Sequence, residues 1–236
     1  MRRLLMAGIL TLGFGHLAFG AIAQEMELTD GTNTALIDSL GVLHLTGSAS
    51  GTATVNLALG VYTFNGSIGN YSVNVTTGEG SPLLPMGSLD LNSVDTAPGP
   101  ASGPLKVWWS ENGITATNTA WTMTWGGTLS SGAGGNVAYT AYEDNTNAFF
   151  GTQNTINTIG PQGPGIVGGT ASGSVGLTLV PHSLSQLITL NGVGATNYSG
   201  NAAVNPVVPE PASVFLFGGV VLAVATALRR KVINKV

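Results

Sequence analysis

The side chains that could do acid–base or nucleophilic chemistry are few in this sequence. His44 and His182 are the two histidines outside the N-terminal segment. His44 lies in the predicted strand 42–46 and His182 follows Pro181 at the end of a strand, so we interpret both as packing or surface residues. No Gly-x-Ser-x-Gly or His-Glu-x-x-His motif occurs. A glycosidase needs two carboxylates at a set separation. The sequence alone does not show which two carboxylates would lie close together. The available ones are Glu79, Asp90, Asp95, Glu111, Glu143 and Asp144.

One acidic turn carries the oxygen ligands that calcium prefers. Glu143-Asp144-Asn145-Thr146-Asn147 follows a stretch with strand periodicity, and oxygens at alternate positions of a turn suit Ca²⁺. The EF-hand spacing is absent, however, and Asp and Asn also favour turns for backbone reasons. We predict no metal and no cofactor, with Asp144, Asn145 and Asn147 as the alternative for calcium. The chain contains no cysteine, which excludes thiolate metal sites and disulfides.

The tryptophans give the clearest indication of a binding surface. Trp108, Trp109, Trp121 and Trp125 are close in sequence and fall on two predicted strands. Side chains alternate between the faces of a strand, so Trp108 and Trp109 must point to opposite faces, while Trp121 and Trp125 share one face. Tryptophans of this kind usually fill a core. The functional alternative is an exposed aromatic platform that stacks on sugar rings.

The elements that would position these residues are strands. Apolar and polar residues alternate along 71–76, 121–125, 137–142 and 174–179, and Gly, Asn, Pro or Ser clusters bound each stretch. Further strands are expected at 42–46, 52–59, 61–64, 89–94, 105–110 and 184–190. No stretch between residues 24 and 208 keeps a helical period. The sequence therefore predicts an all-β domain over 24–200.

Nine or ten short strands with frequent turns favour a β-sandwich, with a jelly roll as one form of it. An extended repeat solenoid is the alternative, although no fixed repeat period supports it. The Gly- and Pro-rich stretch 160–169 is interpreted as a turn-rich surface loop, and residues 201–208 as a polar linker.

The N-terminus reads as a secretory signal peptide over residues 1–23. Arg2 and Arg3 precede an apolar stretch over 4–19, and Ala21-Ile22-Ala23 has the small-x-small pattern of a cleavage site, which makes Gln24 the new N-terminus. The alternative is a retained N-terminal anchor.

The charges are divided unevenly along the chain. Lys106 is the only Lys or Arg between residues 24 and 208, whereas ten of the eleven acids lie there, so this part has a formal net charge of −9. Such a surface repels phosphates, and no basic patch offsets it. The composition therefore excludes nucleic acid as a partner.

The C-terminus has three parts in a fixed order. Pro209-Glu210-Pro211 is a rigid triplet, residues 213–228 form an uncharged apolar segment, and Arg229-Arg230-Lys231 is a basic cluster. The apolar segment spans about 24 Å as a helix, which is short for a bilayer of about 30 Å of hydrocarbon. The basic cluster should remain on the cytoplasmic side and orient the helix. A plain C-terminal membrane anchor would need no more than this.

The three parts together resemble the PEP-CTERM sorting signal. The resemblance covers residues 209–236, with a tail that continues past the basic cluster through residues 232–236. It implies a Gram-negative host and an exosortase, a membrane-embedded enzyme that would process the chain near Pro209, Glu210 and Pro211. The two prolines hold the backbone extended and deny it helix, which suits a processing site.

Three functions follow as hypotheses. The first is an exported, non-catalytic protein, anchored by its C-terminal helix before processing and then left at the cell surface or in the extracellular matrix. The second is a carbohydrate-binding module for extracellular polysaccharide that uses the tryptophans. The third and least favoured is a secreted hydrolase, which would need paired carboxylates in a groove.

Overall fold

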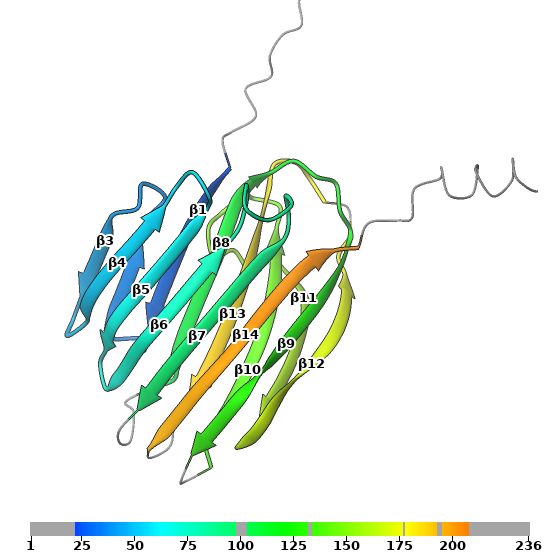
Figure 1. Cartoon of the computed structure of the whole chain (residues 1–236). Coiled ribbons are helices and arrows are strands. Elements are labelled where there is room, and N and C mark those ends of the chain that lie inside the picture. The colour runs from blue at the N-terminus through cyan, green and yellow to red at the C-terminus, as the bar shows by residue number, and fades with distance from the viewer. Residues whose placement is uncertain (1–21, 98–102, 132–133, 177, 193–194, 208–236) are drawn as a thin grey trace, which may run out of the picture.

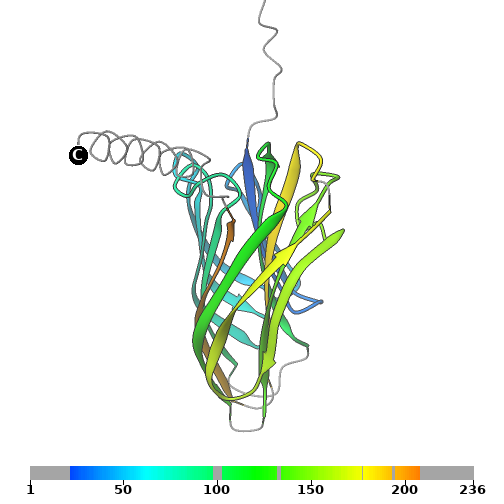
Figure 2. The ribbon, with the colours of Figure 1, turned by 90° about the vertical axis from the view of Figure 1, so that its right-hand side faces the viewer.

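The protein is a sandwich of two antiparallel sheets, each with seven strands (Figures 1 and 2). The computed structural model describes residues 22–97, 103–131, 134–176, 178–192 and 195–207. The predicted signal peptide, apart from Ile22 and Ala23, and the predicted transmembrane segment 213–228 lie outside these residues. Within them, no helix is long and apolar enough to cross a bilayer.

Sheet A contains the predicted strand with Trp108 and Trp109. Its strands, in spatial order, are β11 (Asn154–Gln162), β10 (Asn136–Asp144), β13 (His182–Asn191), β8 (Leu105–Ile114), β1 (Ala23–Thr29), β2 (Thr34–Ile37) and β3 (Leu43–Thr46).

Sheet B contains the strand with Trp121 and Trp125. Its strands, in spatial order, are β12 (Gly165–Ser174), β9 (Ala120–Ser131), β14 (Thr196–Pro206), β7 (Leu89–Ala97), β6 (Tyr71–Glu79), β5 (Val61–Ile68) and β4 (Ser50–Asn56).

From β7 onward the chain crosses repeatedly between the two sheets. Sheet B takes the order β12-β9-β14-β7 and sheet A the order β11-β10-β13-β8, and β10 and β11 are the only consecutive strands in this half that pair with each other. This interleaved order is that of an eight-stranded jelly roll. The first six strands extend it, because β1 to β3 continue sheet A and β4 to β6 continue sheet B.

The core lies between the sheets and is filled by the inward side of each alternating strand. The fully buried Trp109 of sheet A meets Tyr62 of sheet B with ring centroids 5.1 Å apart, and its indole N–H donates to the carbonyl of Glu79 at 2.9 Å. Trp109 lies against Gly78, where an added Cβ would come within 2.4 Å of the indole ring. Close contact between the sheets at this point therefore requires glycine.

The all-β prediction and the two-sheet arrangement are confirmed, and the solenoid alternative is wrong. The expected number of strands was too low, since the described residues form fourteen. The stretch 160–169 is not simply a loop, because β11 ends at Gln162 and β12 starts at Gly165. The linker is also much shorter than predicted, because Asn201 to Pro206 belong to β14 and pair with β7 and β9.

One predicted strand is wrong in position. The alternation along 174–179 suggested a strand, but β12 ends at Ser174 and the next strand starts only at His182. Leu179 and Val180 are exposed in the intervening loop, so their apolar character does not reflect burial in a sheet.

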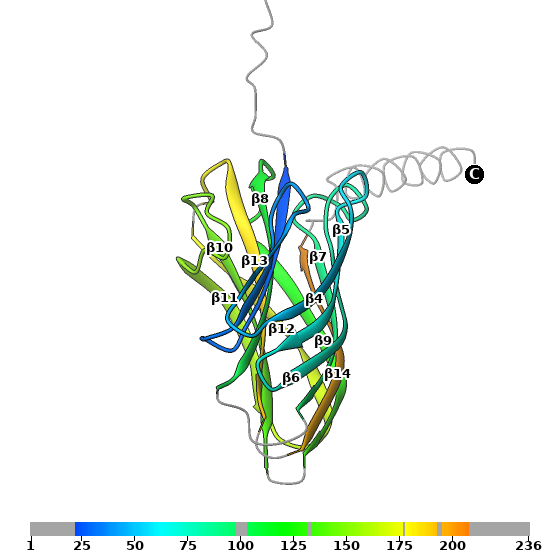
Figure 3. The same ribbon diagram turned by 90° about the vertical axis from the view of Figure 1, so that its left-hand side faces the viewer.

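The strands of both sheets end at two opposite ends of the sandwich (Figures 1 and 3). We call the end at which β1 begins and β14 ends the exit end. Antiparallel pairing places six connections there, namely 38–42, 57–60, 80–88, 115–119, 145–153 and 175–181. The two ends of the described chain therefore lie at the same end of the sandwich.

Candidate functional site

The four tryptophans are mostly core residues. Trp109, Trp121 and Trp125 are 0%, 1% and 4% exposed, so they fill the core, and the alternative that they form a sugar-stacking platform is wrong for these three. Trp125 donates its indole N–H to the hydroxyl of Tyr198 inside the sandwich. Trp108 is partly exposed on the outer face of sheet A, as the alternation along β8 required. It is the one tryptophan that a ligand in solvent could reach.

Trp108 belongs to an aromatic cluster that the sequence did not reveal. Tyr142 of β10 and Phe150 of the following loop lie with ring centroids 5.7 Å and 6.1 Å from Trp108, at interplanar angles of 34° and 58°. Phe149 extends the group, 6.4 Å from Phe150. All four side chains are partly exposed. We call these four residues the aromatic cluster. The adjacent pair Phe149-Phe150 in a loop rich in Asn was the signal that could have identified it.

The backbone at Phe150 is held in an unfavourable conformation. Its φ is 54°, in the left-handed region that bulky residues avoid, and such a conformation costs on the order of 1–3 kcal/mol. The N–H of Phe150 donates to the hydroxyl of Ser110 at 3.1 Å, which fixes the loop on the outer face of β8. Strain of this kind concentrates at functional sites. Here it places an aromatic ring beside Trp108.

Acidic side chains lie beside the aromatic cluster on the same face. The register of β1 against β8 puts Glu27 opposite Trp108 and Glu25 opposite Ser110. Burial raises the pKa of both carboxyls, and the Lys106 ammonium partly offsets the effect on the pKa of Glu27. The face thus offers aromatic rings next to carboxylate acceptors, the two kinds of group that contact the rings and hydroxyls of sugars.

The turn considered for calcium is explained by hydrogen bonds within the protein. Asp144 Oδ1 accepts from the N–H and the hydroxyl of Thr146. Asn145 Oδ1 accepts from Leu179 N–H at 2.6 Å, and Asn147 Oδ1 from Gly113 N–H at 2.7 Å. The three oxygens therefore serve different donors and fasten this loop to its neighbours. No group of three His, Asp or Glu side chains among the described residues is placed to hold a metal ion.

Several titratable groups are buried between or beside the sheets. The Glu111 carboxylate accepts from Gln24 Nε2 at 3.0 Å and from the N–H and hydroxyl of Ser81 at 2.7 Å and 3.0 Å. Burial raises the pKa of Asp95 to about 7 and lowers the pKa of His182 to about 4. These groups lie in the interior and are not assembled into an acid–base pair with one another. His44 instead bonds Asp38 at 2.8 Å on the surface.

The outer face of sheet B is built from small neutral side chains. Two shallow hollows of about 550 and 530 Å³ lie along β9, lined mainly by Thr, Ser, Asn and Gly. Asn201 lines the first hollow and donates to Asp90, and Glu79 lies opposite Asp90 in the register of β6 and β7. Burial raises the pKa of Asp90. Glu79 and Asp90 are thus two carboxylates on neighbouring strands of this face, the kind of pair that a hydrolase would need.

The predicted signal-peptide cleavage point lies at the start of a strand. Ala23 is the first residue of β1 and pairs with Asn112, and the Gln24 side chain is buried with Glu111 and Ser81. A protease needs an extended, accessible backbone, so we expect cleavage after Ala23 to precede the pairing of β1 with β8. Ala21 lies outside the described residues.

The comparisons with known proteins identify the C-terminus. Residues 207–231 match the PEP-CTERM protein-sorting motif, which confirms the resemblance seen in the sequence. The match includes Pro209, Glu210 and Pro211 and the basic residues Arg229, Arg230 and Lys231. Its first residue, Val207, donates its N–H to the carbonyl of Ala120 at 2.9 Å at the exit end. Comparison with curated proteins finds no match for this chain.

Proposed function

We propose that this chain is an exported, non-catalytic protein of the cell surface or the extracellular matrix. The observation that carries the proposal is the PEP-CTERM motif that begins at Val207, one residue after the last strand of the sandwich. The motif marks the chain for export and for a membrane-embedded sorting step. The acidic, cysteine-free domain before it is then the part that remains outside the cell.

Processing by an exosortase near Pro209 to Pro211 would release the sandwich from its anchor. Only Val207 and Val208 separate this triplet from β14, and the triplet itself resists helix formation because of its prolines. The enzyme would therefore act within a few residues of the folded domain, at the membrane surface. After cleavage the sandwich would keep all fourteen described strands.

A triple substitution of Pro209, Glu210 and Pro211 by alanine tests this proposal. The processed wild-type protein is expected outside the membrane fraction, whereas the variant should stay in the membranes with its C-terminus intact. Pro164→Ala, at an exposed proline between β11 and β12, is the matched control and should behave as the wild type. Normal release of the triple variant would contradict the proposal.

A second candidate function, binding of extracellular polysaccharide, is favoured by the aromatic cluster. Its support is the partly exposed Trp108, the strained Phe150 beside it, and Glu27 on the neighbouring strand. The jelly-roll order of β7 to β14 adds only an analogy, because one fold serves many functions. The ligand would be a sugar chain that stacks on the aromatic cluster on the outer face of sheet A.

Affinity electrophoresis in gels that contain the host's purified extracellular polysaccharide tests the second candidate. An aromatic contact is worth about 1.5 kcal/mol, so Trp108→Ala should bind the polysaccharide about tenfold more weakly, as measured by the dissociation constant from the gel retardation. Ile166→Ala, at the most exposed apolar side chain and on the other sheet, is the matched control and should change nothing. Equal retardation of Trp108→Ala and wild type would eliminate this site.

The non-catalytic part of the proposal has its own test. If the protein were a hydrolase, Glu79 and Asp90 would be the carboxylates to examine. We expect incubation of the same polysaccharide with wild-type protein to release no reducing ends. Release that Glu79→Gln or Asp90→Asn abolishes would replace the proposal by the hydrolase hypothesis.

A further inference from the structure

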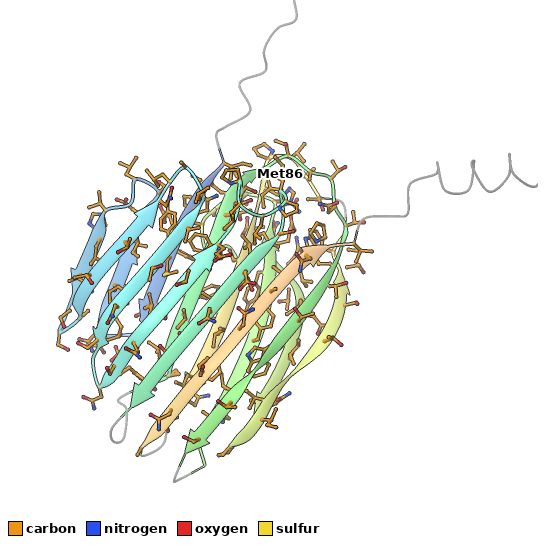
Figure 4. All side chains as sticks on the ribbon, viewed as in Figure 1. Met86 is labelled. Carbon is orange, nitrogen blue, oxygen red and sulfur yellow. The ribbon has the colours of Figure 1, made fainter. Side chains whose placement is uncertain are left out.

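The exposed apolar side chains of the sandwich gather at one end. Among the described residues, eleven large apolar side chains are exposed, and nine of them lie in the connections of the exit end or directly after β14. Only Leu45, within β3, and Ile166, near the start of β12, lie elsewhere. We call the nine the apolar rim; they are Leu40, Val42, Leu57, Leu59, Leu83, Met86, Leu179, Val180 and Val207. Figure 4 shows Met86 at this end.

The loops that carry the apolar rim are fixed to each other and to the strands. Leu83 N–H donates to the carbonyl of Leu59 at 3.3 Å, and Gly80 N–H to that of Gly60 at 3.1 Å. Leu179 N–H donates to Asn145 at 2.6 Å, which ties the loop 175–181 to the loop 145–153. The rim is therefore presented on a defined scaffold, and its side chains are exposed because the fold places them so.

An apolar hollow of about 280 Å³ adds to this end. It is lined by Ile22, Ser81, Pro82, Leu84 and Met86, so that the rim includes a recess as well as protruding side chains. Exposed apolar side chains scattered over a surface are ordinary, whereas their concentration at one place marks a contact surface. The opposite end of the sandwich has no comparable group among the described residues, because only Leu45 and Ile166 are exposed large apolar side chains outside the rim.

The position of the sorting motif indicates what covers the rim. Val207 is both a rim residue and the first residue of the motif, and only residues 207–212 separate β14 from the apolar segment at 213–228. Six residues reach at most about 20 Å when fully extended. A chain anchored through that segment therefore keeps the exit end within reach of the bilayer. At such a short tether, even weak affinity for the bilayer suffices for contact.

We propose that the apolar rim rests on the lipid bilayer while the chain is anchored by its C-terminus. The inference depends on the anchoring that the proposed function includes, but it concerns the described loops and not the tail. Leucine, valine and methionine side chains enter the interfacial zone of the membrane, the part that apolar faces of peripheral elements occupy. The sandwich then stands on its exit end, and both outer faces of its sheets remain open to solvent.

The charges select the kind of lipid. The turn 38–42 contains Asp38 and the β6 strand ends at Glu79, whereas Lys106, the one Lys or Arg that the structure describes, lies near the start of β8 at the opposite end. The exit end therefore favours zwitterionic headgroups and is repelled by anionic ones. Contact should weaken in vesicles rich in phosphatidylglycerol at low salt and recover when salt screens the charges.

Single-cysteine labelling of the full chain tests this contact, because the native sequence has no cysteine. Leu83→Cys places a fluorescent label on the rim, and Ile166→Cys places one on an equally apolar, exposed position at the far end. Each labelled chain is reconstituted into phosphatidylcholine vesicles that contain nitroxide-labelled phospholipid. Quenching should be several-fold stronger at position 83 than at position 166. Adding Leu40→Ser and Leu59→Ser to the Leu83→Cys chain should reduce it several-fold.

Flotation of the vesicles separates this inference from the proposed function. A chain that fails to float lacks the C-terminal anchor. That result overturns both the proposed function and the bilayer contact of the apolar rim. A chain that floats, with equal quenching at positions 83 and 166, overturns the bilayer contact alone. A label at position 83 that is shielded from a water-soluble quencher but not quenched by nitroxide lipid also overturns it, because a second copy or the chain's own tail then covers the rim.

Discussion

Asp95 should make this protein less stable as the pH rises from about 4 to about 7. The carboxyl lies on β7, is fully buried, and faces the core between Val73 and Tyr198. Its Oδ2 accepts from the Ser93 hydroxyl at 2.6 Å, while Oδ1 has no hydrogen-bond partner among the described residues. Burial disfavours the ionised form and raises the pKa to about 7, and the Ser93 hydrogen bond only partly offsets this.

Proton linkage gives the sign and the size of the effect of Asp95 on the free energy of unfolding. The unfolded chain loses the Asp95 proton near pH 4, whereas the folded chain keeps it until about pH 7. Below pH 4 the group is neutral in both states and has no effect. Between the two pKa values the folded state loses about 1.4 kcal/mol per pH unit relative to the unfolded state. The accumulated loss above pH 7 is on the order of 4 kcal/mol, a large part of a typical domain stability.

Asp95→Asn isolates this contribution, because asparagine has nearly the same shape and does not titrate. Urea unfolding of both proteins in the same detergent buffer, followed by tryptophan fluorescence, gives the free energy of unfolding from pH 4 to pH 8. Any cost of the amide itself is independent of pH. The difference between variant and wild type should therefore shift by about 4 kcal/mol towards the variant across this range. A constant difference at all pH values would refute the reasoning.

Three further predictions concern the core and the outer face. Burial lowers the pKa of His182 to about 4, so His182→Gln should reduce the loss of stability as the pH falls from about 6.5 to 4 in the same unfolding assay. Gly78→Ala should lower the free energy of unfolding by about 1–3 kcal/mol, since the new methyl group meets the Trp109 ring. Trp109→Ala should cost about 3–5 kcal/mol and Trp108→Ala clearly less; equal losses would contradict their opposite orientations.

The strands that the sequence predicted well are those with large apolar residues on one side. Tyr71 and Val73 in β6 and Trp121, Met123 and Trp125 in β9 alternate cleanly with polar residues, so burial on one face left a clear record. The prediction missed five strands, namely β1, β2, β11, β12 and β14. Of these, β11 and β12 were missed because their residues are mostly Gly, Thr, Asn and Ser. β12 is held by pairing with β9, which is distant in sequence, and β11 by pairing with the preceding strand β10. Residues of this kind do not display either pairing in the sequence.

The sequence predicted only part of the candidate site, because the rest depends on contacts between residues distant in sequence. Alternation required one of Trp108 and Trp109 to face outward, but the choice depended on which face of β8 the second sheet covers. The proximity of Tyr142 and Phe150 to Trp108 comes from the placement of β13 between β8 and β10 and from the loop after β10. The C-terminal sorting motif, by contrast, is defined by the order of its three parts along the chain, so the sequence alone was sufficient to recognise it.

The intact mass of the native protein, taken from cells and from their surroundings, tests export and sorting most directly. We predict that the released form lacks residues 1–23 at its N-terminus and ends within or close to Pro209-Glu210-Pro211. A protein found only in the cytosol, with the mass of all 236 residues, would contradict the proposed function and the membrane contact that depends on it.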